Sequence, residues 1–514
     1  MNLTKTNETA LPGRRAAERW LLGVLFALML GAIAFGAWAG FPVNDDAYLV
    51  LFLRETGAGS LAEAHPNRPV YGILLEGVAG LVGLHRAPYV GIGIAFWALL
   101  AWQTNRLSRR LFPQQTTFGA LAALLILAPI LVSTQYTTVT TLIPANLPVS
   151  LSLAALLICL REGSERRPGA LAAAMCFVAA AGTISEYGIA TCMAAAALLW
   201  MLRRRRAAVF LSLGAAAGYL VFRAVGDLSV RPKQVPSEQL GKFFSNPLTG
   251  VFRLVEGVWS CLLGAYGTAA GAIRIDVESR STILAALVGL AAAILIGRLC
   301  RLRRTTEAED GAGTVFLGLA LAVAAGLLPV VLANRSPVST DPYESRYLLP
   351  VLPFAVIATA YGLHRVAVPR FRPWAAAILA FLAGYGAVTG AFGARNEQRR
   401  MEELGRALQP LVRASSGITV AVCPDRERLD GADMTPKVTW RWTDAEARRA
   451  WVMPLNEARP LFGTRASCRD TDRIDLPRYL LSTRREGPVS HLVWVPMDAG
   501  FRSGIEPYCC DGAR

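Results

Sequence analysis

The sequence predicts an all-α polytopic membrane protein with about eleven transmembrane helices, followed by a small soluble domain. Hydrophobic residues make up 53% of its 514 residues and charged residues only 18%, whereas soluble proteins carry about 25% charged residues. The hydrophobic residues form continuous runs, and about 20 such residues are enough for a helix to cross a bilayer. A soluble enzyme is therefore excluded, and so is a membrane β-barrel, whose strands would alternate apolar and polar residues.

The net charge of +16 comes largely from arginines that lie beside the apolar runs. In a soluble protein this balance would suggest nucleic acid, but short clusters at the ends of spans are what the positive-inside rule requires. We therefore expect no nucleic-acid partner and place all the clusters in the cytoplasm. They are Arg14, Arg15 and Arg19; Arg106, Arg109 and Arg110; Arg161, Arg166 and Arg167; Arg203, Arg204, Arg205 and Arg206; Arg298, Arg301, Arg303 and Arg304; and Arg365, Arg370 and Arg372.

The first apolar run, Leu21–Ala39, follows a basic N-terminus and is predicted to be a retained signal anchor that runs outward from the cytoplasm. In the external loop 41–86, Val70–Leu84 is too short for a comfortable span and predicts an interfacial helix. In the external loop 226–280, Val255–Ile273 predicts an interfacial or re-entrant helix, because a crossing there would turn the later arginines outward. The other predicted spans are 87–103, 116–134, 146–160, 169–185, 187–202, 207–225, 281–299, 313–333, 346–363 and 373–393.

The sequence divides into a membrane domain, 1–393, and a polar C-terminal domain, 394–514, predicted to lie outside the membrane. Apolar residues at helical spacing over 396–413 predict a helix, and Ile418–Val422 and Leu492–Val495 predict short buried strands. We expect a small α/β or α+β domain. An oxidising compartment favours disulfides among its cysteines, and Cys423 with Cys468 is the expected pair; Cys509 and Cys510 are the others.

The strongest candidates for chemistry are Asp45 and Asp46, directly after the first span. Adjacent carboxylates at a membrane boundary repel one another, so they are placed there where water, a metal ion or a bound partner compensates. The alternative is that they cap a helix beginning at Ala47. On the same predicted face lie His65-Pro-Asn-Arg68-Pro and Glu344-Ser-Arg346-Tyr347-Leu-Leu-Pro.

Together these motifs resemble the GT-C superfamily of integral-membrane glycosyltransferases, which includes protein O-mannosyltransferases and lipid A aminoarabinose transferases. In that family an acidic pair follows the first transmembrane helix, an Arg-Pro opens a later helix of the same loop, and an Arg-Tyr-Leu-Leu-Pro-like segment begins a late span. The resemblance covers residues 20–393. Many members have Asp-Glu where this chain has Asp45-Asp46, so the acceptor class stays open between lipid, glycan and protein.

The resemblance implies transfer of a sugar from a polyprenyl-phosphate donor to an acceptor outside the membrane, usually with inversion. Asp45 or Asp46 would act as general base, or the pair would hold a divalent cation such as Mg or Mn. The leaving phosphate needs cationic partners. The external candidates are Arg68, Lys233, Arg335 and Arg346, with Arg346 beside Tyr347 the first choice and an interfacial anchor the alternative reading of that pair.

Two more residues are candidates for substrate binding. Glu186, in a tight apolar corner between two predicted spans, is either solvated or turned toward the catalytic cavity. His65 either binds substrate or is an ordinary loop residue. The uncharged stretch Ser133–Thr141 is rich in hydroxyls that could bind a sugar or could form a hairpin.

Two other functional classes remain open. A polysaccharide ligase or polymerase would rely on external Arg and His rather than on an acidic pair, and a transporter of lipid-linked sugars would show internal repeats and broken helices. Composition favours a bacterial inner membrane, with a cytoplasmic N-terminus, a periplasmic C-terminal domain and membrane lipids as partners.

Overall fold

The computed structural model describes two units of the chain. One unit comprises Met1–Ala37 and Leu61–Ala394, and the other Trp38–Ser60 and Arg395–Arg514. The described residues are 12–37, 69–82, 86–113, 116–127, 142–227, 247–272, 279–302, 312–332, 347–366, 370–389 and 391–392 in the first unit, and the strands 419–422, 437–439, 452–454, 478–486 and 489–496 in the second.

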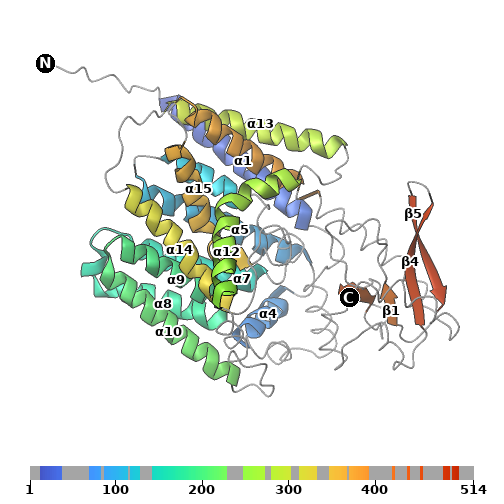
Figure 1. The fold of residues 1–514 in the computed structure, drawn as a ribbon, viewed down its shortest axis with the longest axis horizontal. Helices are drawn as coiled ribbons and strands as arrows, with labels where there is room; N and C mark the ends of the chain where they lie inside the picture. The colour runs from blue at the N-terminus through green and yellow to red at the C-terminus, as the bar shows by residue number, and fades with distance from the viewer. Residues whose placement is uncertain are drawn as a thin grey trace. The chain divides into compact units, whose positions relative to one another are not determined.

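The described part of the first unit is helical (Figure 1). Its helices are α1 (Pro12–Ala37), α4 (Pro69–Val82), α5 (Arg86–Leu111), α6 (Thr116–Leu127), α7 (Leu142–Cys159), η3 (Ser164–Arg166), α8 (Pro168–Ile184), α9 (Glu186–Met201), α10 (Arg205–Asp227), α12 (Pro247–Ala272), α13 (Ser279–Leu302), α14 (Ala312–Leu332), α15 (Leu352–Val366) and a last helix over 372–389.

Three of these helices are long and apolar enough to cross a membrane: Arg205–Ala224 in α10, Thr282–Arg301 in α13 and Gly313–Leu332 in α14. Large apolar side chains stand exposed along them at helical spacing, as a lipid-facing stripe does. They include Val209, Leu213 and Leu220 on α10, and Ile283, Leu287, Leu290 and Ile294 on α13. The prediction of a helical membrane protein is supported in this coarse form, and shorter apolar helices such as α8 and α9 accompany the three.

Several arginine-bearing helix ends lie together. At the end of α7, a guanidinium nitrogen of Arg110 donates to Leu157 O, and Arg204 Nη1 donates to Cys159 O over 2.7 Å. On the other side of α5, Phe112 stacks on Tyr361 of α15 with ring centroids 4.1 Å apart. We call this the basic end of the helical unit. It includes the ends of α5, α7 and α15 and the start of α10.

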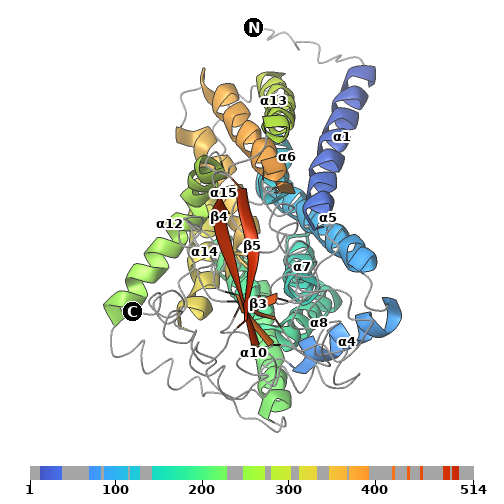
Figure 2. The ribbon, with the colours of Figure 1, turned by 90° about the vertical axis from the view of Figure 1, so that its right-hand side faces the viewer.

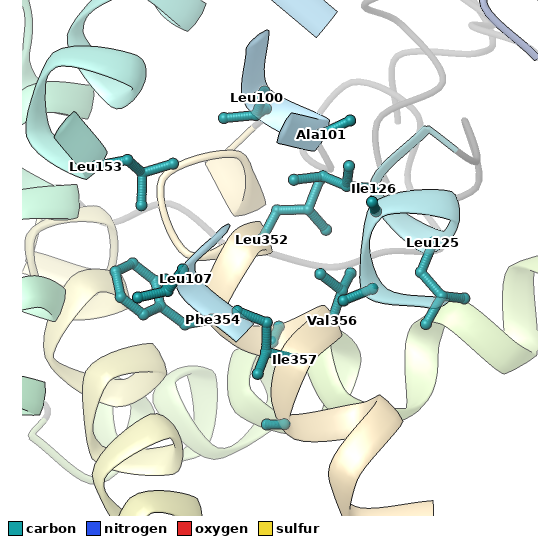
Figure 3. Packing of buried hydrophobic residues seen from close by; sticks show 14 of the residues in the cluster. Leu100, Ala101, Leu107, Leu125, Ile126, Leu153, Leu352, Phe354, Val356 and Ile357 are labelled. Carbon is teal, nitrogen blue, oxygen red and sulfur yellow. The ribbon is translucent and has the colours of Figure 1, made fainter. Parts of the chain in front are cut away.

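The core lies where α5, α6, α7 and α15 meet (Figure 3). Leu100, Leu153 and Val356 are among the side chains buried there. In a lipid bilayer the hydrophobic effect does not drive helices together, so their association depends on close van der Waals packing. Gly214 and Gly218 supply it on α10 as a Gly-xxx-Gly pair, since a Cβ on Gly218 would lie 2.5 Å from Ala179 O of α8.

The structure corrects several predicted helix limits. α5 continues to Leu111, past the predicted end at 103, because its last turns are held by packing and by the bond from Arg110 to α7. α15 begins at Leu352, after the predicted start at 346, because Pro350 disfavours helix at Leu349, whereas Pro353 is tolerated in the first turn of the helix. Hydropathy follows the apolar run, whereas the helix follows its hydrogen bonds.

The two predicted interfacial helices are both present as helices. α4, Pro69–Val82, matches the expected 70–84, and α12 begins at Pro247, well before the expected Val255. α12 packs on α14 and α15, and Figure 1 shows it steeply inclined to α14. One face of α12 exposes apolar residues at helical spacing: Leu248, Val251, Phe252, Val255 and Trp259.

The described part of the second unit is a five-stranded sheet in the order β3-β2-β1-β4-β5 (Figure 2). Its strands are β1 (Thr419–Val422), β2 (Lys437–Thr439), β3 (Val452–Pro454), β4 (Arg478–Glu486) and β5 (Val489–Pro496). β1 and β4 are parallel, and the other neighbours are antiparallel. The predicted strands at 418–422 and 492–495 correspond to β1 and β5. The predicted helix over 396–413 and Cys423, Cys468, Cys509 and Cys510 lie outside the described residues.

Candidate functional site

Two of the predicted site residues, Glu186 and Tyr347, lie in the described part of the chain. The other predicted site residues fall outside it: Asp45, Asp46, His65, Arg68, Lys233, Arg335 and Arg346. Among the described residues no group of three or more His, Cys, Asp or Glu is placed to hold a metal ion. The Mg or Mn site expected at the acidic pair therefore stays a prediction.

Glu186 is the first residue of α9, and a sharp turn places it there. Ser185 is extended, with φ −163° and ψ 163°, and separates α8 from α9. Gly188 N donates to Ser185 O over 3.0 Å, which closes the turn. A Cβ on Gly188 would collide with the backbone of Ala181, so the turn requires glycine at 188. Glu186 is half-buried in the first turn of α9, where the helix dipole stabilises a carboxylate.

The segment that carries Tyr347 packs on the same helix. The Thr191 hydroxyl lies 2.9 Å from Tyr187 O and 3.1 Å from Pro350 O, so it joins the second turn of α9 to the residues just before α15. Gly326 of α14 fits beside this junction, because a Cβ there would lie 3.0 Å from Ala190 O. The structure thus brings together the elements that carry Glu186 and Tyr347.

Buried polar side chains extend from this junction into α7 and α5. Ser152 Oγ donates to Gly188 O over 3.2 Å, which joins α7 to α9, and Gln103 Nε2 donates to Ser150 O over 2.9 Å, which joins α5 to α7. We call the whole set the buried polar layer. It consists of Gln103, Asn146, Ser150, Ser152, Ser185 and Thr191.

Several polar atoms of this layer have no hydrogen-bond partner among the described residues. They are both amide atoms of Asn146, the hydroxyls of Ser150 and Ser185, and Gln103 Oε1. Asn146 and Ser185 are both 0% exposed. Leaving such a group unpaired costs about 1–3 kcal/mol. A bound water molecule, ion or ligand removes this cost by supplying the missing hydrogen-bond partner. The sequence interpretation missed these residues. Their position as neutral polar residues inside apolar runs could have marked them as candidates.

The basic end has a structural role instead. Arg204 Nη1 also lies 3.1 Å from Arg161 O, and Ser164 Oγ donates to Cys159 O over 2.7 Å, so the last carbonyls of α7 are capped. Burial lowers the pKa of Arg110, and the charges of Arg161, Arg106 and Arg204 lower it further. The cluster is thus a capped helix end with mutually repelling charges.

Exposed tryptophans stand beside arginines at three places in the helical unit. Arg106 lies 5.5 Å above the Trp102 ring, Arg205 lies 5.5 Å above Trp200, and Arg301 lies 5.1 Å above Trp374. Each of these tryptophans is more than half exposed. Tryptophan and arginine pairs of this kind are typical of the level of lipid headgroups.

No protein-family model, curated protein or solved structure matches this chain. Its function is therefore argued from its own residues.

Proposed function

We propose that the protein is a GT-C-type membrane glycosyltransferase, which moves a sugar from a polyprenyl-phosphate donor to a lipid, glycan or protein acceptor on the extracytoplasmic face. The observation that carries the proposal is the acidic pair Asp45-Asp46 directly after the first apolar helix. It is followed in order by Arg68-Pro and by Arg346-Tyr347-Leu-Leu-Pro, which parity assigns to the same face.

The proposed topology is eleven spans, with a cytoplasmic N-terminus and a periplasmic C-terminal domain in a bacterial inner membrane. Arg110 and Arg204, which both reach the last carbonyls of α7, support it, because arginines of three helix ends gather at one place in the unit. The exposed Trp102 and Trp200, beside Arg106 and Arg205, support a membrane interface there. α8 begins at the basic end, so the Ser185–Glu186 turn, about 25 Å along that helix, belongs to the opposite, periplasmic side.

In the proposed reaction, Asp45 or Asp46 takes the proton of an acceptor hydroxyl as its oxygen attacks the anomeric carbon. The bond from that carbon to the phosphate oxygen breaks on the opposite face, so the configuration inverts. Arg346, Arg68 and Lys233 stabilise the negative charge that develops on the lipid phosphate. A divalent cation held by the two aspartates would supply further charge stabilisation at that phosphate.

Glu186, Tyr347 and His65 are assigned to substrate binding. Glu186 and Tyr347 belong to elements that the Thr191 hydroxyl joins, which supports a shared role for the two. A carboxylate at this depth of a membrane protein is costly unless it faces a polar cavity or a partner. Glu186 is therefore the third carboxylate of the proposed site.

A transporter of lipid-linked sugars is the second candidate, and one observation favours it. Pro148 lies inside α7 and Pro329 inside α14, and each removes a backbone donor from its helix. Helices interrupted beside buried polar residues are typical of transporters. The two candidates differ in whether a glycan product forms.

The deciding experiment supplies polyprenyl-phosphate sugars to membranes containing the wild type, Asp45→Asn, Asp46→Asn or, as an exposed control, Glu256→Gln. We expect the wild type and the control to release polyprenyl phosphate and at least one aspartate variant to lose more than 100-fold in rate, because a general base contributes about 10²–10⁴-fold. Donor movement across the membrane without any release of polyprenyl phosphate would instead establish the transporter.

A further inference from the structure

Asn146, Ser150 and Gln103 lie together in the buried polar layer. Asn146 and Ser150 are four residues apart on α7, so their side chains share one face of that helix. Gln103 Nε2 reaches Ser150 O over 2.9 Å from α5. All three side chains are at least 97% buried, because their exposed fractions are 0%, 3% and 3%.

The unpaired atoms of this group have a defined chemistry. Asn146 offers an amide donor and an amide acceptor, Ser150 a hydroxyl, and Gln103 the acceptor Oε1, and none of these atoms has a partner among the described residues. Each of the three side chains is uncharged. Neutral donors and acceptors side by side match hydroxyl groups, whereas a phosphate or a metal ion would call for charged groups.

The position on α7 adds a second argument. Asn146 lies in the second turn of the helix, at the end remote from the arginine-capped carbonyls. Pro148 has no N–H, so the carbonyl of Pro144 lacks its helical donor and the hydrogen bonding of α7 is interrupted in its N-terminal half. The hydroxyl-rich stretch Ser133–Thr141 directly precedes the helix in sequence.

We propose that Asn146, Ser150 and Gln103 form a subsite that binds the hydroxyl groups of the substrate's sugar. This inference rests on the proposed function and deepens it, because it assigns recognition of the sugar to α5 and α7. Internal water offers the same hydroxyl chemistry, so the experiment compares a sugar-bearing lipid with the same lipid without its sugar.

The test measures binding to the purified protein in nanodiscs for polyprenyl phosphate and for a panel of polyprenyl-phosphate hexoses and pentoses. Asn146→Leu removes both amide atoms at similar volume. We expect it to weaken binding of the sugar-bearing lipid about tenfold, the equivalent of about 1.4 kcal/mol, and to leave binding of polyprenyl phosphate unchanged. Ser150→Ala should weaken the same binding several-fold and provides the test if Asn146→Leu does not fold.

The matched control is Thr104→Val. Thr104 is buried beside Gln103 on α5, but its hydroxyl donates to Leu100 O over 2.8 Å and so belongs to its own helix. The Thr104→Val protein should bind both lipids as the wild type does. The ligand-free Asn146→Leu protein should be at least as thermostable as the wild type, because leucine leaves no buried amide unpaired.

Two results would overturn this inference and leave the proposed function standing. The first is that the wild type prefers the sugar-bearing lipid and the variants keep this preference. The second is that the ligand-free Asn146→Leu protein is less thermostable than the wild type. The first would leave water as the partner of the three side chains, and the second would make Asn146 structural. A wild type that binds every sugar-bearing lipid no better than polyprenyl phosphate would contradict the proposed function itself.

Discussion

Replacement of Gly188 by alanine should destabilise the helical unit, because the α8–α9 turn has no room for a Cβ. That atom would collide with the carbonyl group of Ala181, which is backbone and cannot rotate away. Such overpacking costs about 1–3 kcal/mol, and the better helix propensity of alanine returns at most about 1 kcal/mol. We expect a net loss of about 1–2 kcal/mol and a fall in Tm of about 2 °C, because the entropy of unfolding grows with the size of the unit.

A thiol-reactive fluorophore provides the assay, since Cys159 and Cys192 are buried and react only on unfolding, whereas Cys176 is exposed and sets the baseline. Gly169→Ala is the matched control, because it lies in the first turn of α8 with nothing within 4 Å of the added Cβ. It should equal or exceed the wild type in Tm. Equal Tm values for Gly188→Ala and Gly169→Ala would refute the close approach of α8 and α9.

Two other predictions address the basic end and the topology. Arg204→Gln loses the bonds to Cys159 O and Arg161 O, which should lower the free energy of unfolding by about 1–2 kcal/mol. Arg204→Lys should recover only part of this loss, because lysine lacks the guanidinium fork. A Tm for Arg204→Gln equal to that of the wild type would contradict the capping role. Alkaline phosphatase fused after Arg110 or Arg206 should be inactive and fused after Ala394 active, and activity after Arg206 would overturn the assignment of the basic end to the cytoplasm.

The sequence predicted the helices well where apolar runs are long. α10, α13 and α14 fall on predicted spans, and α4 matches its predicted interfacial helix closely. The predicted helix ends were wrong where tertiary contacts determine them. At the end of α5, the arginines lie in the helix because one of them, Arg110, bonds to α7. β4, Arg478–Glu486, was missed because its three arginines and one glutamate obscure the apolar pattern of a strand.

The candidate site was only partly predictable, for a physical reason. Glu186 is charged, so its position inside an apolar stretch marks it at once. Asn146 and Gln103 are neutral and barely change the hydropathy of their helices. Whether their polar atoms are paired depends on a helix 47 residues away, as the bond from Gln103 to Ser150 shows. The pattern of residues within one helix does not show whether such a contact with another helix forms.

α7 combines these opposite demands in one helix. Its C-terminal carbonyls are capped by Arg110, Arg204 and Ser164, which is the arrangement expected where selection favours stability. Toward its N-terminus, Asn146 and Ser150 have buried polar atoms with no partner among the described residues, and a proline interrupts the hydrogen bonds. Leucine at 146 would remove the unpaired amide, so the contrast between the two ends of α7 supports the proposal that its N-terminal half serves binding and its C-terminal end serves folding.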